Sequence, residues 1–242
     1  MSTDQGRATV GGTEVTVIRK DIKNLHLGVY PPDGHVRIAV PLAVTDEAVR
    51  AAVASRLAWI RRQEALFRRQ ARETVREMVS GETHWYAGRR YRLRVVYASG
   101  RARVTLTNRT TMEMRCPPGT SAEGRRHILD LWYRRQLSAA IPALLDAWCP
   151  RVGVERPTWG LRRMKTKWGS YSEATGRAWF NTELAKKPPR ALEYVVVHEL
   201  THVAVRRHSD WFLGLLDAQL PHWRLVRAEL GSLPLGNEDW RT

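Results

Sequence analysis

The sequence predicts an α+β protein with a strand-rich N-terminal half and a mainly helical C-terminal half. Two groups of short segments, within residues 14–40 and 83–106, alternate apolar and polar residues with the period of β-strands. A long run with helical spacing of apolar residues follows each group, and the pattern after residue 189 is helical almost throughout. Runs of strands followed by runs of helices are typical of the α+β class.

The first strand group is expected to form a meander of three strands. Val15–Ile18, Leu25–Val29 and Val36–Val40 carry the alternation, and Pro31–Gly34 has the chemistry of a tight turn. Thr45 is the expected N-cap of the long helix that follows. The polar side of this helix is rich in arginine, which fits either a solvated face or a binding surface.

The second group is expected to contain strands at Thr83–Tyr86, Arg89–Tyr97 and Arg101–Leu106. The segment Cys116–Gly119 interrupts the pattern, and a second long helix is predicted over Ser121–Trp148. We therefore expect an N-terminal β-rich domain with one long helix over residues 13–118, and a C-terminal domain over residues 119–242. Within the latter, residues 158–164 and 177–181 predict two strands joined by a Gly/Ser-rich turn.

Composition and charge exclude several classes of protein. The chain has 242 residues, of which 43% are apolar and 26% charged, so it is not collagen-like, disulfide-stapled or of low complexity. It contains two cysteines, without CxxC spacing, which predicts reduced thiols. No apolar run is long enough for a membrane span and no secretory signal is visible, so a cytoplasmic location without membrane partners is expected. The net charge of +16 favours anionic partners, including nucleic acid.

The sequence His198-Glu199-Leu200-Thr201-His202 is the pattern HExxH. On a helix the two histidines lie one turn apart on one face, where both imidazoles can reach one tetrahedral zinc ion. Glu199 is offset by about 100° from His198, beside the metal, where it can take a proton from a metal-activated water. The motif therefore predicts two ligands and a general base, with one zinc or another divalent ion per chain.

A third ligand is also required. On a continuous helix His208 would lie about 9 Å along the axis from His202, which is too far to share a metal. The helix must therefore end near Val205–Arg207, and His208 would return to the site if the next helix starts near Trp211. The alternative third ligand is a carboxylate further along the chain, such as Glu229.

Several ordered strings resemble the YgjP-like metal-dependent hydrolase family. In the C-terminal half they are Met164–Tyr171, Trp179–Leu184, Pro188-Pro189, Tyr194–His202 and His208–Phe212. The N-terminal half matches more loosely, so that the resemblance covers nearly the whole chain; its strings there are Val79–Glu82, Gly88–Leu93 and Trp132–Arg134. The chain departs from the family pattern at Tyr171, where the family has cysteine. The string Asn181–Leu184 and the tail Pro234–Trp240 resemble the branch of the family that is often found beside type I restriction–modification genes.

The resemblance implies a zincin-like C-terminal domain of the minimal gluzincin or SprT-like type, built on the HExxH helix. It implies His198, His202 and His208 as metal ligands and Glu199 as the catalytic base. Two strands beside the active helix would then form the substrate site. The residues expected to contact substrate are Trp168, Gly169, Ser170, Asn181 and Arg163. Gly169 would let a substrate approach closely, and Asn181 would tie a loop or orient a ligand. Tyr194, Arg163 and His222 are candidates for stabilising an oxyanion.

The expected function is zinc-dependent hydrolysis, with a protein or peptide as the first choice of substrate. SprT-like proteases act on DNA-bound proteins, and the basic charge suits such a role. A nucleotide substrate is the alternative, with the enzyme acting as a nucleoside-triphosphate pyrophosphatase on UTP. A third reading, from a different class, is a DNA-binding accessory protein of a restriction–modification system that keeps the metal for structure.

Overall fold

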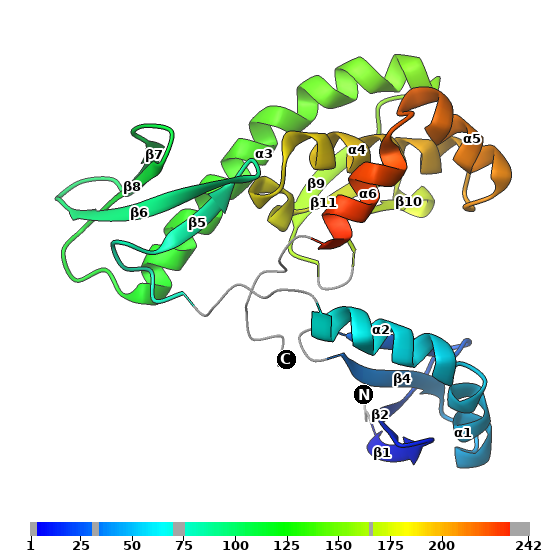
Figure 1. Ribbon diagram of the computed structural model, residues 1–242. Coiled ribbons are helices and arrows are strands. Elements are labelled where there is room, and N and C mark those ends of the chain that lie inside the picture. Colours follow the sequence, from blue (N-terminus) through cyan, green and yellow to red (C-terminus); the bar gives the residue numbers. More distant parts are fainter. Residues whose placement is uncertain (1–3, 31–33, 70–75, 165–166, 233–242) are drawn as a thin grey trace. The chain divides into compact units, whose positions relative to one another are not determined.

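The computed structural model describes residues 4–30, 34–69, 76–164 and 167–232 (Figure 1). The chain divides into two units between Glu73 and Thr74. Both units combine a sheet with helices, which confirms the predicted α+β class. Within the described residues, no helix has the length and apolarity needed to cross a bilayer. Cys116 and Cys149 are both free thiols, and both are buried.

The first unit packs two helices on a four-stranded sheet. Its strands are β1 (Asp4–Val10), β2 (Thr13–Lys20), β3 (His26–Tyr30) and β4 (His35–Pro41), in the order β1-β2-β4-β3. The predicted meander is therefore wrong, because β2 pairs with β4 in parallel and β1 adds a hairpin partner to β2. Alternation along a strand identifies its buried face but not its neighbour.

The predicted long helix of this unit is two helices, α1 (Asp46–Ala54) and α2 (Leu57–Arg69). Thr45 caps α1 as expected, since its side chain accepts a hydrogen bond from the backbone N–H of Ala48. Apolar residues of α1 and α2 share one core with the sheet; among them are Val17, Ile38, Val49, Val53 and Ile60.

The second unit begins with a four-stranded sheet that packs on a long helix. The strands are β5 (Thr83–Tyr86), β6 (Arg89–Tyr97), β7 (Arg103–Leu106) and β8 (Thr111–Cys116), in the order β5-β6-β8-β7. Sequence patterning missed β8. The helix α3 (Ala122–Val152) begins at the Ser121 cap and ends at Gly153, which has a φ of 77°.

The boundary expected near residue 118 lies inside this unit. Leu93 and Met112 from the sheet and Leu129 and Trp132 from α3 belong to one buried cluster. The sheet and α3 thus complete each other's core, and the Cys116–Gly119 segment is a connection within the unit. The structure divides the chain about 45 residues earlier, at Glu73.

The rest of the unit places a small sheet beside three helices. Its strands are β9 (Thr158–Arg162), β10 (Gly169–Ser172) and β11 (Arg177–Asn181), in the order β10-β11-β9. Both predicted strands are present, but more than a turn joins them, because β9 and β11 run parallel and β10 lies between them in sequence. The helices, which follow the short 3₁₀ helix η2 (Thr182–Lys186), are α4 (Pro189–Ala204), α5 (Asp210–Gln219) and α6 (Trp223–Ser232).

Helix α4 is tied to α3 along the core of this unit. The indole N–H of Trp148 on α3 donates to the carboxylate of Glu193 on α4, at 3.1 Å. Val195, Val196 and Val197 on α4 are almost fully buried. A helix that is apolar on several sides is held rigidly, which suits it to position functional side chains.

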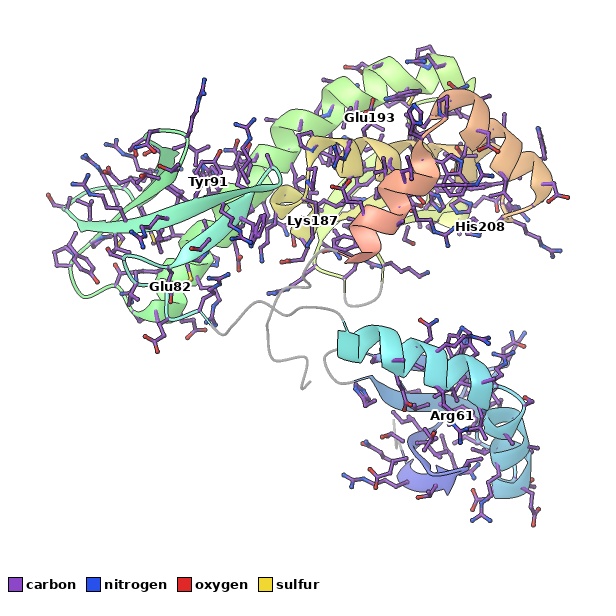
Figure 2. All side chains as sticks on the ribbon, in the orientation of Figure 1. Arg61, Glu82, Tyr91, Lys187, Glu193 and His208 are labelled. Atoms are coloured by element: carbon purple, nitrogen blue, oxygen red, sulfur yellow. The ribbon has the colours of Figure 1, made fainter. Side chains whose placement is uncertain are left out.

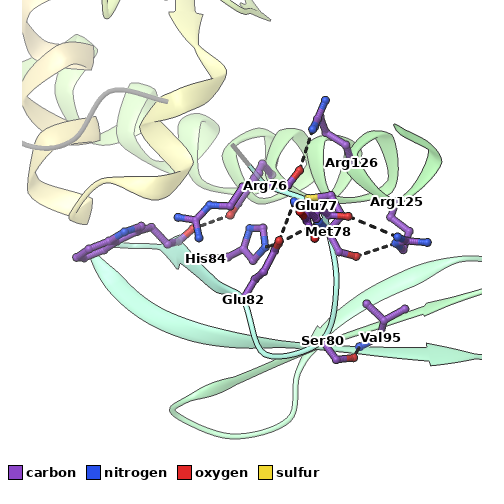
Figure 3. A network of polar contacts seen from close by, with 11 residues as sticks. Arg76, Glu77, Met78, Ser80, Glu82, His84, Val95, Arg125 and Arg126 are labelled. Atoms are coloured by element: carbon purple, nitrogen blue, oxygen red, sulfur yellow. Dashed lines mark hydrogen bonds and ion pairs between the residues drawn. The ribbon is translucent and has the colours of Figure 1, made fainter. Parts of the chain in front are cut away.

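The chain enters the second unit through a network of polar contacts (Figure 3). The carboxylate of Glu82 accepts hydrogen bonds from the backbone N–H groups of Glu77 and Met78, at 2.7 and 3.0 Å, and contacts His84 at 3.3 Å. The guanidinium of Arg125 on α3 donates to the carbonyl of Met78 at 2.7 Å. Met78 has a φ of 61°, a left-handed conformation that this network holds in place.

His84 is expected to make the second unit sensitive to acid. Burial and the nearby Arg76 lower its pKa from 6.5 to about 4, although Glu82 acts in the opposite direction. The unfolded chain therefore binds this proton first as the pH falls, and the unfolding free energy decreases from pH 6.5 to about 4, by about 3 kcal/mol in all. Denaturant unfolding from pH 7.5 to 4.5 should show a shallower pH dependence in His84→Gln. Equal pH dependence in both proteins would contradict the assignment.

Candidate metal centre

Helix α4 carries the HExxH motif and ends at Ala204, close to the end predicted near Val205–Arg207. Pro189 occupies the first turn, where its missing N–H costs nothing. Val205 leaves the helix with an extended backbone, at φ −138° and ψ 111°. Ser209 then caps α5, since its hydroxyl accepts a hydrogen bond from the N–H of Phe212 at 3.3 Å. The break between α4 and α5 returns His208 to the motif (Figure 2).

The structure brings His198, His202 and His208 together. One nitrogen from each lies within 4.8 Å of the others, and the Nε2 atoms of His198 and His208 are 3.2 Å apart. Phe212, which is fully buried, packs against all three rings, with centroid distances between 4.6 and 5.1 Å. The rings are therefore held around a common point on an apolar support.

These residues fit a tetrahedral metal ion. Zn–N bonds of about 2.0–2.1 Å at tetrahedral angles place two ligand nitrogens about 3.3 Å apart, close to the separation of the two Nε2 atoms. The Nδ1 of His202 lies 3.2 Å from the carbonyl of Val205, so Nδ1 carries the proton and Nε2 is left to bind. Burial lowers the pKa of His198 to about 3 and also lowers that of His202. Neutral imidazole is the form that binds metal.

Glu229, the alternative third ligand, is engaged elsewhere. Its carboxylate accepts a hydrogen bond from the Nε of Arg190 at 2.6 Å and forms an ion pair with that guanidinium. Arg190 also holds the pKa of Glu229 below its ordinary value. Among the residues that the structure describes, the histidine cluster does not include Glu229.

Glu199 is buried beside the histidines. Only 4% of the residue is exposed, and its Oε2 has no hydrogen-bond partner among the described residues. Burial raises the pKa of Glu199 to about 7, against smaller opposing effects from the backbone amide of Tyr171 and from Lys167. A carboxyl group with this pKa can accept and release a proton near neutral pH.

Gly169 leaves the space that the side chain of Glu199 occupies. A Cβ atom at Gly169 would lie 2.5 Å from the Oε1 of Glu199 and 2.7 Å from its Cγ. The missing side chain thus provides the space in which the carboxylate of Glu199 lies. Sequence reasoning expected this glycine to admit a substrate, and the contact with Glu199 supplies a different physical reason for it.

A cavity of about 1110 Å³ opens beside the histidines and Glu199. Trp168, Gly169 and Ser170 line it, as expected for a substrate site. They belong to β10 or directly precede it, and β10 is an edge strand of its sheet. An edge strand therefore contributes to the lining of the cavity, and most of the other lining residues come from α4, α5 and α6.

Arg163 and Asn181 do not line this cavity, and the structure corrects both expectations. Asn181 is buried; its Nδ2 donates to the carbonyls of Met164 and Lys167, both at 2.8 Å, and its Oδ1 accepts from the N–H of Glu183. It therefore ties the loop before β10, which is one of the two roles expected for it. Arg163 lies 3.9 Å from the carboxylate of Glu183 instead.

The sequence analysis did not identify the residues of α6 that line the cavity. Trp223 and Arg227 of α6 line the cavity, and Trp223 stacks on Tyr194 with 6.1 Å between centroids and 7° between planes. Tyr194, one of the three oxyanion candidates, also lines the cavity, whereas His222 does not. The spacing in the sequence could have indicated these residues. Trp223 and Arg227 are four positions apart, as are Tyr194 and His198, and residues four positions apart lie on one face of a helix.

A scan against family models matches the YgjP-like metallopeptidase domain over residues 23–233. The chain belongs to the YgjP-like metallopeptidase family. It is accordingly a metal-dependent hydrolase that uses a divalent ion. The family match begins within the first unit and runs through the second, so both units are part of the YgjP-like chain.

Two further comparisons add little to the family assignment. A search of the curated proteins finds no significant match. Among solved structures, the chain is similar to the crystal structure of the metallopeptidase zymogen of Methanocaldococcus jannaschii jannalysin, at 19% identity and a TM-score of 0.34. That alignment covers 37% of this chain and 92% of the other.

Replacing His208 by Ala is expected to weaken metal binding at least 100-fold, because one of three ligands is removed. The matched control is Glu229→Gln, which should keep full metal content and lose only a solvent-exposed ion pair that contributes little to stability. Metal content after dialysis, measured by mass spectrometry, distinguishes the two variants. Loss of metal in Glu229→Gln and not in His208→Ala would place the third ligand on α6.

Proposed function

We propose that the chain is a zinc peptidase in which Glu199 is the general base and His198, His202 and His208 hold the metal. A bound zinc ion would supply Lewis acidity toward the scissile carbonyl and the attacking water. The observation that carries the proposal is the carboxylate of Glu199, buried with a raised pKa beside three converging imidazoles. A purely structural metal site would need no such base.

The chain's own residues suggest how the reaction proceeds. Glu199 takes a proton from the attacking water and passes it to the leaving amine. Tyr194 lines the same cavity and carries a hydroxyl that can donate to an oxyanion; burial raises its pKa, so it remains protonated. The edge of β10 offers backbone groups that can pair with an extended peptide.

An unfolded or extended protein segment is the substrate that this arrangement fits best. A compact folded domain could not lay its backbone along β10 and place a peptide bond between Glu199 and the histidines. The net charge of +16 further supports proteins associated with nucleic acid as targets.

A nucleoside triphosphate is the second candidate substrate. The cationic side chains of Lys167 and Arg227 line the cavity and could bind phosphates. Against this candidate, large apolar and aromatic side chains also line the cavity, among them Phe212, Leu216 and Trp223. Such a lining suits a side chain of a peptide better than a polyphosphate.

The test measures metal content and hydrolysis on the same samples. Wild-type protein, the chelated protein and the chelated protein with zinc restored would each receive a denatured protein substrate and a set of nucleoside triphosphates. The proposal expects about one zinc per chain and proteolysis that chelation abolishes and zinc restores. Triphosphate cleavage without proteolysis would replace it with the pyrophosphatase function. Stable metal with neither activity would favour the DNA-binding accessory protein.

A further inference from the structure

The sheet β5-β6-β8-β7 has one buried face and one open face. Tyr91 and Leu93 of β6 point into the core against α3, so the residues that alternate with them point outward. The open face carries five exposed arginines from three strands; they are Arg90, Arg92, Arg94, Arg103 and Arg115. We call this set the arginine face.

The arginine face has a strong excess of positive charge. Glu113 of β8 is the one acidic residue among those that point outward from these four strands. It contacts Arg115 at 2.7 Å and Arg94 at 3.8 Å, and the hydrogen bond from Arg115 lowers the pKa of Glu113. Glu113 therefore stays ionised and holds two of the guanidinium groups in place without neutralising the face.

An aromatic ring lies on the same face. Trp85 of β5 is directly opposite Arg90 in the sheet, and the guanidinium of Arg90 lies 5.0 Å from the centre of its ring. Trp85 is half-buried, so part of its surface faces solvent. A ring of this kind can stack with a nucleobase, and a stacked guanidinium remains able to bind phosphate.

We propose that the arginine face binds single-stranded nucleic acid. All of its cations are arginine, whose planar fork binds phosphate oxygens in pairs. The arginines of β6 repeat about every 6.7 Å and neighbouring strands lie about 4.8 Å apart, so several phosphates of one strand can be contacted together. A four-stranded sheet is too broad for the major groove of a duplex, which admits a helix or a two-stranded ribbon.

The open face fits other anionic partners less well. A membrane-binding surface combines cations with projecting apolar side chains, whereas the residues between these arginines are mainly threonines, such as Thr83 and Thr105. The other, buried face of this sheet packs on the N-terminal half of α3, and the histidine cluster lies at the end of α4 and in the turn after it. The inference deepens the proposed function, because it gives a peptidase of nucleic-acid-bound proteins a place to hold the nucleic acid.

The test is fluorescence anisotropy of the full chain with labelled 20-nucleotide dT and U strands and a 20-base-pair duplex. The triple variant Arg90→Gln/Arg92→Gln/Arg103→Gln is compared with Arg50→Gln/Arg56→Gln/Arg62→Gln, which removes equal charge from exposed positions of the first unit. We expect the first variant to weaken single-strand binding at least tenfold and to reduce the salt slope by about 2, and the second to change affinity less than threefold. Trp85→Leu should weaken binding at least fivefold.

Several results would overturn the proposal. They are equal weakening by the two triple variants, preference for the duplex, and tighter binding to phosphatidylserine vesicles than to either single strand. The dT and U strands distinguish DNA from RNA. Thermal unfolding of each variant shows whether it is folded, and the outward side chains should leave the melting temperature nearly unchanged. All binding measurements use protein that also carries Glu199→Gln, so that no hydrolysis accompanies binding. A result that overturns nucleic-acid binding by the arginine face is therefore distinct from a result that overturns the peptidase function.

Discussion

Replacing Glu199 by Gln is expected to lower the rate of proteolysis by a factor of about 10² to 10⁴ while leaving the metal content unchanged. Glutamine keeps the shape of the side chain in the space above Gly169, but it cannot accept a proton. The three histidines are untouched. The decisive measurement is therefore kcat and bound metal on the same preparation.

The pH profile gives a second readout of the same substitution. Burial raises the pKa of Glu199 to about 7, and a nearby divalent cation favours the carboxylate and lowers this value. The wild-type kcat/KM should therefore fall on the acidic side of neutrality, as Glu199 becomes protonated. The residual activity of Glu199→Gln should lack this acid limb.

Glu193→Gln is the matched control on the same helix. Glu193 accepts a hydrogen bond from Trp148 and does not line the cavity, and glutamine can still accept that bond. Activity within twofold of wild type is expected. If Glu199→Gln were as active as Glu193→Gln, the general base would have to be a group other than Glu199.

Local rules account for what the sequence predicted well. The HExxH spacing, the end of α4 near Val205 and the Ser209 cap all depend on residues within a few positions of one another. Helical periodicity and capping are local in this sense, and together they return His208 to the histidines. The histidine cluster was therefore predictable although it combines helix α4 with the turn that follows it.

Non-local pairing accounts for what the sequence did not predict. The parallel pairing of β9 with β11 leaves β10 at the sheet edge, and no local pattern fixes that order. Asn181 and Arg163 lie close to the site in sequence, but their side chains point to the loop before β10 and to Glu183. The direction of a polar side chain at the end of a strand depends on neighbours that only the folded chain brings together.

The contact between Gly169 and Glu199 has the second-largest expected effect. Gly169→Ala would place a Cβ within 2.5–2.8 Å of three atoms of Glu199, distances that real Cβ atoms do not tolerate. The Cγ of Glu199 is among them, so rotating the carboxylate alone cannot relieve the overlap. We expect kcat to fall about 100-fold, since a shift of about 1 Å in a catalytic group has an effect of that size. Metal content should remain at the wild-type level.

Gly214→Ala is the control, because Gly214 is exposed on α5 with open space around it. That substitution should leave kcat unchanged and stabilise the protein by about 0.5–1 kcal/mol through helix propensity.

A double-substitution cycle separates displacement of Glu199 from general damage. If Gly169→Ala acts only by moving the base, it should cost about 100-fold in wild-type protein and almost nothing in Glu199→Gln, where no base remains to be moved. Additive losses would mean that the methyl group harms the site by another route, such as overpacking β10 against α4, which typically costs about 1–3 kcal/mol of stability. Unfolding measurements on the four proteins distinguish the two cases, because a displaced base changes the rate far more than it changes the unfolding free energy.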